Sequence, residues 1–310
     1  MTETIVISGG GLRAELLPLG AALHRFEVQM DNGTWRNVVL SRADPSRNDM
    51  FQYGASIGRF ANRIAGARIT IDGIEYRLDP NEGEIQVHGG PVGFSDRLWL
   101  VVDRAPDSVV FRLISPDGDQ GFPGELTVTA EFQVIDGGIR VVYSATTDAP
   151  TVINLTTHPY FILGGTTIDD HRVQVAASQY TPTTVDHLPT GEILPVDGTP
   201  LDLRDARVVR DVLADLAATG FERGGGINHS YVVDGTGLRL HASLVGPSGL
   251  AVDVFSDAPG VELYSLGGFG NRGLAIEPQD FPDAPNQPTF PSPVLRPGVT
   301  YRRTIEWRVR

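Results

Sequence analysis

The chain has 310 residues, a formal net charge of −13 at pH 7 and no cysteine. Its acidity argues against nucleic acids and anionic membranes as partners, because binding either needs clustered Lys and Arg. The lack of cysteine excludes disulfides, thiolate nucleophiles and Cys-ligated metals. The first residues show no signal-peptide pattern and no apolar run approaches about 20 residues, so we expect a cytoplasmic protein that does not cross a membrane.

Alternating apolar and polar residues dominate the chain and predict β-strands. The segment RITIDGIEYRL (68–78) alternates on both sides of Asp72-Gly73, a pair typical of hairpin turns. The segment ELTVTAEFQVIDGGIRVVYSATT (125–147) repeats this arrangement around a DGG turn, and TYRRTIEWRV (300–309) alternates again. Short strands with frequent Gly and Pro between them predict an all-β fold, a large antiparallel β-sandwich or barrel.

One segment has helical spacing instead. Within residues 203–225, apolar residues recur at intervals of three and four, and Gly220 can end the helix. These apolar residues are Val209, Val212, Leu213 and Leu216. We predict one or two short helices, and we expect residues 1–310 to form one domain. Residues 158–200 and 268–298 are rich in Pro, Gly and Asp, and long irregular segments of this kind are often functional.

His158 lies in INLTTHPYF (153–161), where a strand-like run leads to a histidine followed by Pro159. Proline cannot donate to a sheet ladder, and it disfavours helical geometry in the residue before it. We therefore expect His158 in an extended backbone near a strand end, beside two aromatic rings. Two interpretations stay open from this segment alone: a core histidine bonded to a backbone carbonyl, or a general acid or base.

His88 and Glu277 also stand next to conformationally special residues. His88 precedes two glycines in VHGGPVGF, which would allow a ligand close to the backbone. The alternative is an ordinary loop histidine. Glu277 is expected to close the apolar strand 274–276 before Pro278, where partial burial would raise its pKa toward the range of a general base. The alternative is an exposed glutamate. No HxH or HExxH spacing occurs, so no metal site is predicted.

A basic cluster lies in IGRFANRIAGARI (57–69). Arg59, Arg63 and Arg68 are too widely spaced for a phosphate loop, and no GxxxxGK[ST] sequence occurs. Arg63 beside Asn62 offers several planar donors to the hydroxyls of a polar ligand, although arginines that cap strand ends would have the same pattern. The absence of a GxSxG sequence disfavours a serine hydrolase.

In combination, these motifs resemble the aldose 1-epimerase (mutarotase) family, in order and over nearly the whole chain. GASIGRFANRIA resembles the family segment whose Asn-Arg pair binds sugar hydroxyls, here Asn62 and Arg63, and VHGGPVGFSDRLW resembles its His-Gly-Gly segment, here His88. INLTTHPYFIL and AIEPQDFPDAPN resemble the segments with the catalytic histidine and glutamate, here His158 and Glu277. The resemblance implies a large antiparallel β-sandwich with its site in an open cleft.

Two departures from the family pattern fall on sugar-binding positions. Asn228 stands where the family usually has Asp, and Glu262 stands where it usually has Gln. Thr157 and Ile162 also replace residues that are usually Asn. An amide both donates and accepts hydrogen bonds, whereas a carboxylate only accepts. The exchanges therefore imply that this pocket recognises a different pattern of sugar hydroxyls from that recognised by the usual family members.

The resemblance implies a reaction on a free monosaccharide without metal or redox cofactor. Glu277 would take the proton of the anomeric hydroxyl while His158 gives a proton to the ring oxygen, so that the ring opens and recloses on either face. His88 could share the acid role. The residues that would orient the hydroxyls are Asn62, Arg63, His88, Asn228 and Glu262. The expected oligomeric state is a monomer or a homodimer.

Three other functions stay open. A hexose-6-phosphate epimerase is similar in fold and would need a cationic phosphate pocket, to which Arg59, Arg68 or Arg223 could contribute. A non-catalytic carbohydrate-binding protein on the same fold would result if the two exchanges removed catalysis. A glycoside hydrolase would need two carboxylates flanking the scissile bond, for which Glu262 and Glu277 are the candidates.

Overall fold

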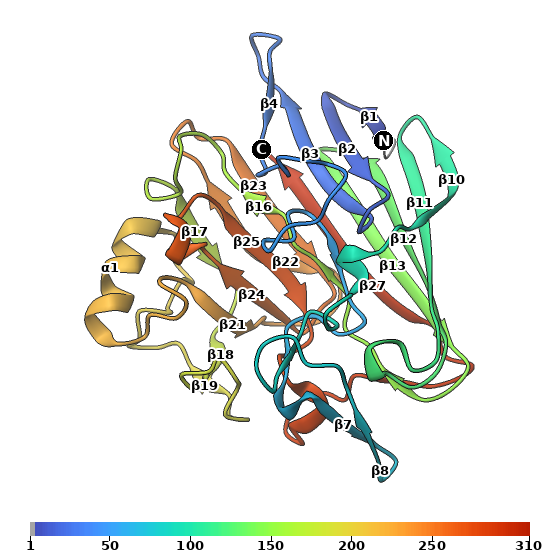
Figure 1. Cartoon of the computed structure of the whole chain (residues 1–310). Helices are drawn as coiled ribbons and strands as arrows, with labels where there is room; N and C mark the ends of the chain where they lie inside the picture. Colours follow the sequence, from blue (N-terminus) through green and yellow to red (C-terminus); the bar gives the residue numbers. More distant parts are fainter. Residues whose placement is uncertain (1–3) are drawn as a thin grey trace.

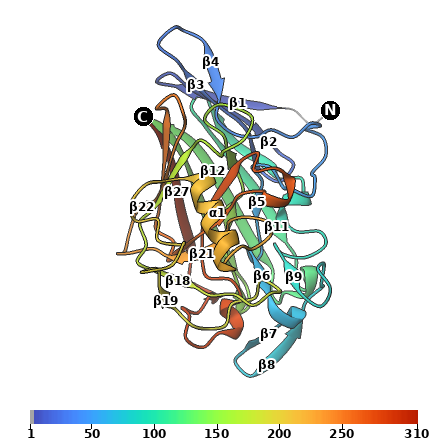
Figure 2. The ribbon, with the colours of Figure 1, turned by 90° about the vertical axis from the view of Figure 1, so that its left-hand side faces the viewer.

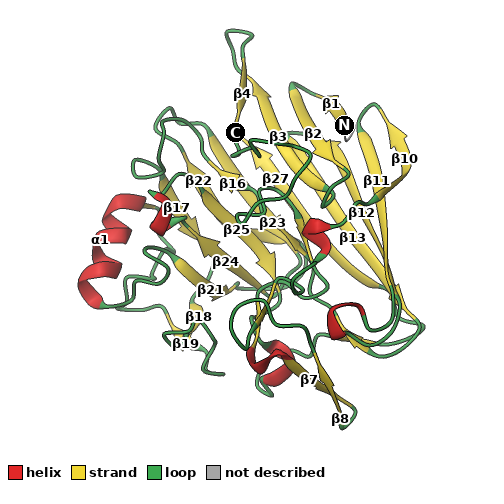
Figure 3. Ribbon diagram, viewed as in Figure 1, coloured by secondary structure: helices red, strands yellow, loops and turns green. Residues whose placement is uncertain are grey.

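The computed structural model describes residues 4–310, and it confirms the predicted antiparallel β-sandwich. A nine-stranded sheet forms one layer (Figure 1, Figure 3). A four-stranded sheet and a six-stranded sheet cover it as the second layer. Residues 38–40 bond to residues 160–162 and so connect the two sheets of that second layer.

Strands that are distant in the sequence lie side by side in the two larger sheets. In spatial order, the nine-stranded sheet contains β10 (Leu100–Ala105), β11 (Ser108–Ser115), β12 (Leu126–Ile135), β13 (Gly138–Thr147), β27 (Tyr301–Val309), β23 (Ala251–Ser256), β22 (Arg239–Val245), β17 (Arg172–Val175) and β20 (Arg207–Val208). The six-stranded sheet contains β16 (Tyr160–Phe161), β25 (Leu274–Gln279), β24 (Gly260–Tyr264), β21 (Asn228–Val232), β18 (Gln179–Thr181) and β19 (Leu194–Pro195). The four-stranded sheet contains β1 (Ile5–Gly9), β2 (Leu12–Leu17), β3 (Ala22–Gln29) and β4 (Trp35–Asn37).

Shorter elements complete the described part of the chain. The two-stranded pairs are β5 (Ser56–Ile57) with β15 (Thr156–Thr157), β6 (Arg63–Ile64) with β9 (Gln86–Val87), β7 (Arg68–Ile71) with β8 (Ile74–Arg77), and β14 (Thr151–Val152) with β26 (Val294–Leu295). The 3-10 helices are Ala65–Ala67, Phe94–Asp96, Asp119–Gly121, Gly267–Phe269 and Ala284–Asn286. Among residues 4–310, no helix combines the length and the apolarity needed to cross a membrane.

The local predictions for hairpins and helix are confirmed. Asp72 and Gly73 both have positive φ (52° and 81°), as a type I′ turn between β7 and β8 requires. The helix α1 (Val209–Thr219) ends at Gly220, whose φ of 74° is the left-handed cap that glycine adopts without strain. The helix lies outside the edge of the sandwich beside β17, and the turned view in Figure 2 shows it along its length.

Alternation along the strands decides which side chains fill the core. On β12 the even-numbered residues from Leu126 to Phe132 are buried, and the residues between them are not. Trp307 of β27 is fully buried between the layers, with its ring centroid 6.5 Å from that of Phe161 on the six-stranded sheet. On the six-stranded sheet, Leu263 and Ile276 enter the same core. Their sequence neighbours point to the opposite face, where the pocket lies.

Arg59 is a structural residue within this scaffold. Its side chain is only 1% exposed, and its guanidinium donates to the backbone carbonyls of Ser115, Pro116, Pro123 and Gly124. It also donates to the Ser115 hydroxyl at 2.7 Å. One guanidinium therefore donates to several carbonyls at this corner, where four segments of the chain meet.

We expect Arg59→Ala to lower the free energy of unfolding by about 3–5 kcal/mol, because it leaves buried carbonyls without donors and opens a cavity. Urea unfolding followed by tryptophan fluorescence measures the effect. Arg77→Ala on β8 is the matched control, since that side chain is 91% exposed, and it should change the value by no more than about 0.5 kcal/mol. Equal effects of the two substitutions would contradict the structural role of Arg59.

Candidate active site

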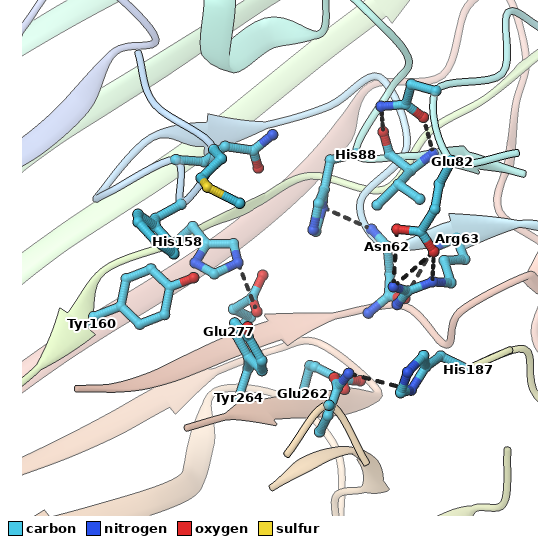
Figure 4. Close-up of a pocket in the computed structure, with 17 residues that line it drawn as sticks. Asn62, Arg63, Glu82, His88, His158, Tyr160, His187, Glu262, Tyr264 and Glu277 are labelled. Carbon is cyan, nitrogen blue, oxygen red and sulfur yellow. Dashed lines mark hydrogen bonds and ion pairs between the residues drawn. The ribbon is translucent and has the colours of Figure 1, made fainter. Parts of the chain in front are cut away.

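One pocket of about 360 Å³ lies on the outer face of the six-stranded sheet. Its floor comes from β21, β24 and β25, and its walls come from β6, from the residue after β9 and from the link between β15 and β16. Figure 4 shows His158 and Glu277 pointing toward each other. The pocket is lined by all seven site residues predicted from the sequence, namely Asn62, Arg63, His88, His158, Asn228, Glu262 and Glu277.

His158 and Glu277 form the central contact of the pocket. His158 Nε2 lies 3.3 Å from Glu277 Oε1, and both side chains are buried. Burial lowers the pKa of His158 to about 4. Burial, together with the nearby charge of Glu262, raises the pKa of Glu277 well above its ordinary value. The imidazole thus becomes a weaker base and the carboxyl a stronger one, so a proton can pass between them at small cost.

The expectation that Glu277 closes its strand is wrong. β25 continues through Pro278 to Gln279, and Glu277 lies inside it, paired with Glu262 of β24. Proline is tolerated at this point because the pairing of β25 with β16 ends at Ala275, which leaves one side of the strand without a ladder partner. The glutamate is consequently held by a sheet and is much more buried than a strand-end residue.

His88 is oriented by a reciprocal contact with Asn62. The backbone N–H of His88 donates to the carbonyl of Asn62 at 3.0 Å, and the backbone N–H of Asn62 donates to His88 Nδ1 at 3.2 Å. Nδ1 therefore accepts, and the proton of the neutral ring is on Nε2. Burial, with the nearby His158 and Arg63, lowers the pKa of His88 well below its ordinary value. Both residues have positive φ (66° for Asn62, 53° for His88), a strained conformation that often marks functional sites.

Gly89 explains how the chain can bring His88 to the pocket wall. Its φ is 87°, and a Cβ atom at this position would lie 1.9 Å from the carbonyl oxygen of Gly58. Only glycine permits that approach. The first of the two glycines that the sequence singles out after His88 thus serves close backbone packing.

Arg63 is fixed by Glu82, a residue that sequence reasoning missed. Arg63 Nε donates to Glu82 Oε1 at 3.1 Å, and a terminal nitrogen donates to Oε2 at 3.4 Å (Figure 4). The Asn62 side-chain oxygen accepts from the Arg63 backbone N–H at 2.9 Å, which leaves the Asn62 amide nitrogen to bind a ligand. The only sequence signal for Glu82 was a polar stretch before His88.

Asn228 and Glu262 lie on neighbouring strands of the pocket floor. The Asn228 side-chain nitrogen is 3.5 Å from His187 Nδ1, and the Asn228 backbone N–H donates to His229 Nδ1 at 3.1 Å. His229 points to the other face and is bonded to the Phe221 carbonyl at 2.9 Å, so it positions the strand and stays outside the pocket. Burial raises the pKa of Glu262 to about 8, against the opposing charge of Arg63.

Further pocket residues were not predicted. They are Met50, Phe51, Gln52, Asn81, Glu82, Val87, Tyr160, His187, Gly224 and Tyr264. Tyr160 stands two residues after His158, with ring centroids 4.8 Å apart, and could have been found from its motif. Met50, His187 and Tyr264 come from separate loops and strands, and no local pattern links them.

None of the three arginines considered for a phosphate site lines this pocket. Arg59 is buried in the scaffold, and Arg68 lines a separate hollow beside the β7–β8 hairpin. Arg223 lies in another hollow and bonds to the carbonyls of Gly220 and Glu222. Within residues 4–310, no cluster of three His, Asp or Glu side chains is arranged to hold a metal ion.

A neutral histidine in contact with a buried carboxyl, surrounded by hydrogen-bonding groups, is the arrangement of an enzyme that moves protons on a polar ligand. Comparison with known proteins agrees. The family model for aldose 1-epimerase matches residues 3–308. The aldose 1-epimerase of Escherichia coli (strain K12) is 35% identical over 323 residues, which cover 97% of this chain and 93% of that protein. The chain belongs to the aldose 1-epimerase family.

Two further relatives support the assignment. The galactose mutarotase of Homo sapiens is 35% identical over 314 residues, covering 94% of this chain and 90% of that protein. The crystal structure of an aldose epimerase homologue from C. elegans superposes with a TM-score of 0.91 at 28% identity, covering 100% of this chain and 99% of that one. The match therefore extends over the fold as a whole as well as over the site motifs.

The buried Glu262 makes a testable contribution to stability. A carboxyl whose pKa is higher in the folded than in the unfolded chain binds more protons when folded, so stability falls as the pH rises between the two values. For Glu262 this window runs from 4.5 to about 8. Glu262→Gln should have little effect near pH 4 and should increase the free energy of unfolding by about 2–4 kcal/mol near pH 9.

Urea unfolding of both proteins at the two pH values measures this difference. Glu75→Gln on β8 is the control, because Glu75 is exposed, and it should change neither value by more than about 0.5 kcal/mol. A gain from Glu262→Gln that is equal at both pH values would contradict a cost of ionisation.

Proposed function

We propose that this chain interconverts the α and β anomers of a free aldose by opening and reclosing the sugar ring, with Glu277 as the base and His158 as the acid. As a member of the aldose 1-epimerase family, the chain is an isomerase. The 3.3 Å contact between His158 Nε2 and Glu277 Oε1 supports the assignment of these two residues as acid and base. The reacting oxygens of an aldose, the anomeric hydroxyl and the ring oxygen, are bonded to the same carbon. An acid and a base in mutual contact can therefore each reach one of them.

The reaction needs one proton between the two groups. With the proton on His158, ionised Glu277 takes the anomeric hydroxyl proton while His158 gives its proton to the ring oxygen, and the C1–O5 bond breaks to leave the aldehyde. Rotation about C1–C2 presents the other face of the carbonyl. The ring oxygen then attacks C1 while Glu277 returns its proton to the carbonyl oxygen and His158 recovers its own. All atoms and charges are conserved, and each positioned group contributes about 10²–10⁴-fold.

The other pocket residues orient the sugar hydroxyls in this proposal. Arg63, held by Glu82, presents its remaining N–H donors, and Asn62 presents its free amide nitrogen. His88 donates from Nε2, because Nδ1 is occupied by the Asn62 N–H. His88 thus supports the ring oxygen as a neutral donor, whereas the general acid is the histidine in contact with Glu277.

The alternatives receive less support. A phosphorylated hexose would need a cation for its phosphate, yet Arg63 is the one arginine that lines the pocket within residues 4–310, and Glu82 engages it. A glycoside hydrolase needs carboxylates on opposite sides of a bond, whereas Glu262 and Glu277 lie next to each other on the pocket floor. We also keep as proposals a single domain over residues 1–310, a cytoplasmic location and a monomeric or homodimeric state.

Polarimetry on freshly dissolved α-glucose, α-galactose and other aldoses tests the activity and the preferred sugar together. We expect accelerated mutarotation of at least one free aldose and a lower kcat/KM for the corresponding 6-phosphate, because the one arginine that lines the pocket in the described part of the chain is already engaged by Glu82. Boiled protein is the control for buffer catalysis. Acceleration restricted to a 6-phosphate would favour the hexose-6-phosphate epimerase, and no acceleration with any aldose would contradict the epimerase.

Glu277→Gln and His158→Gln test the assigned roles. Each should lower kcat for the preferred aldose by at least about 10²-fold, because each removes one proton-transfer group while preserving the size of the side chain. Circular dichroism and sugar binding measured by calorimetry verify that the variants are folded and still bind. Activity of Glu277→Gln above one tenth of the original would assign the base to another residue.

A further inference from the structure

Glu262 and Glu277 face each other across neighbouring strands. They are direct partners in the antiparallel register of β24 and β25, so both side chains project from the same face of the sheet. The Cβ atoms of such partners are about 5 Å apart. Side chains of like charge in this arrangement repel each other, and a protein normally avoids it.

Both carboxyls are almost completely removed from water. Glu262 is 5% exposed and Glu277 is 2% exposed. Glu277 Oε1 contacts His158, but Glu277 Oε2 has no hydrogen-bond partner among residues 4–310. No hydrogen bond or ion pair within those residues involves the Glu262 carboxyl, and none is drawn to it in Figure 4. Protein donors thus screen little of the repulsion between the two groups.

The only arginine in the pocket, among the residues that the structure describes, does not neutralise the pair. The charge of Arg63 reaches Glu262 from β6, but its guanidinium is engaged by Glu82 at 3.1 Å. Arg63 and Glu82 together add no net charge. The two floor carboxyls are therefore left as the uncompensated ionisable groups of the pocket.

The remaining titratable groups around the pair are neutral. His158, between β15 and β16, and His88, after β9, are both kept neutral by burial, which lowers the pKa of each. His187, in the loop over Asn228, also has a lowered pKa because it is partly buried. Tyr160 of β16 and Tyr264 of β24 have pKa values raised by burial, so their hydroxyls stay protonated.

Two polar side chains near Glu262 and Glu277 form no hydrogen bond with them. Ser230 is the partner of Glu262 on its other side, in β21, and its hydroxyl oxygen has no hydrogen-bond partner among the described residues. Gln279 follows Glu277 on the same face of β25, and both atoms of its side-chain amide are likewise unpartnered. Neither group supplies the positive charge that two carboxylates would need.

We propose that Glu262 and Glu277 form one coupled carboxyl pair that ionises in two steps, and that Glu262 thereby sets the pH range in which Glu277 can act as a base. This rests on the proposed function for the role of Glu277, but the coupling itself does not. Glu262 is a positioning residue in this reaction, since it acts on the sugar's proton through Glu277. Once Glu262 is ionised, its charge opposes the loss of the single proton that Glu277 and His158 share, so the proton needed for the reaction is kept to a higher pH.

Titration of the carboxyl groups tests the coupling without any enzyme assay. Protein labelled with carbon-13 in the glutamate side-chain carboxyl is titrated by NMR, and the two signals are identified by their loss in Glu262→Gln and Glu277→Gln. For two interacting acids, the two midpoints of the original protein sum to more than the midpoints of the two single variants, and the excess is the interaction. We expect an excess of about one pH unit or more.

The second readout is the pH profile of kcat/KM for the preferred aldose, which reports the ionisation of the free enzyme. In Glu262→Gln the basic limb, where the shared proton of Glu277 and His158 is lost, should move to lower pH by about one unit or more, because the opposing charge is gone. Glu75→Gln on the exposed hairpin is the matched control and should leave the limb in place. A purely structural role for Glu262 would lower the rate at every pH without moving the limb.

The outcomes separate the two proposals. Additive midpoints would overturn the coupling whether or not the chain is an epimerase. In an active enzyme, a basic limb that does not move in Glu262→Gln would overturn the role given to Glu262. An excess in the NMR titration without mutarotation of any aldose would leave the coupled pair established and remove the epimerase function. An excess together with the shifted limb supports both.

Discussion

The alternation of side chains across the six-stranded sheet is the constraint on which the site depends. Successive residues of a strand point to opposite faces, so Leu263 and Ile276 enter the core while Glu262 and Glu277 face the pocket. A shift of the register by one residue would exchange the two faces and put both carboxyls into the apolar core. The burial of the apolar face therefore holds the carboxyls in position without a separate support.

Removal of water then gives these groups their chemistry. In water, a histidine and a glutamate in contact would form an ordinary ion pair. In the pocket, burial lowers the pKa of His158 and raises the pKa of Glu277. The neutral pair, with the proton on Glu277, and the ion pair, with the proton on His158, therefore approach each other in free energy. Burial also raises the pKa of Glu262, and the charge of Glu262 raises that of Glu277 further. The scaffold's rigid corner around Arg59 contributes only to folding.

Much of the site could be predicted, because its strongest residues lie in distinctive local contexts. His158 before Pro159 and Glu277 in an apolar strand were identified from such contexts, and the resemblance to the aldose 1-epimerases gave them roles. The contact of Glu82 with Arg63 could not be predicted, because an acidic residue in a polar loop carries no sign of its partner. The strand through Glu277 was predicted to end too early, since a proline usually ends a strand and the free side of β25 was not visible from sequence.

The sequence by itself determined the local properties: which segments form hairpins, where α1 ends at Gly220, and which residues can carry acid–base chemistry. These follow from side-chain alternation, helical spacing and turn chemistry, which act over a few residues. The tertiary structure alone decided that Arg59 is buried away from the pocket and that Glu262 stands directly opposite Glu277. Strand register and burial depend on how distant segments pack. Register decides which side chains face the pocket, and burial decides how far their pKa values are shifted.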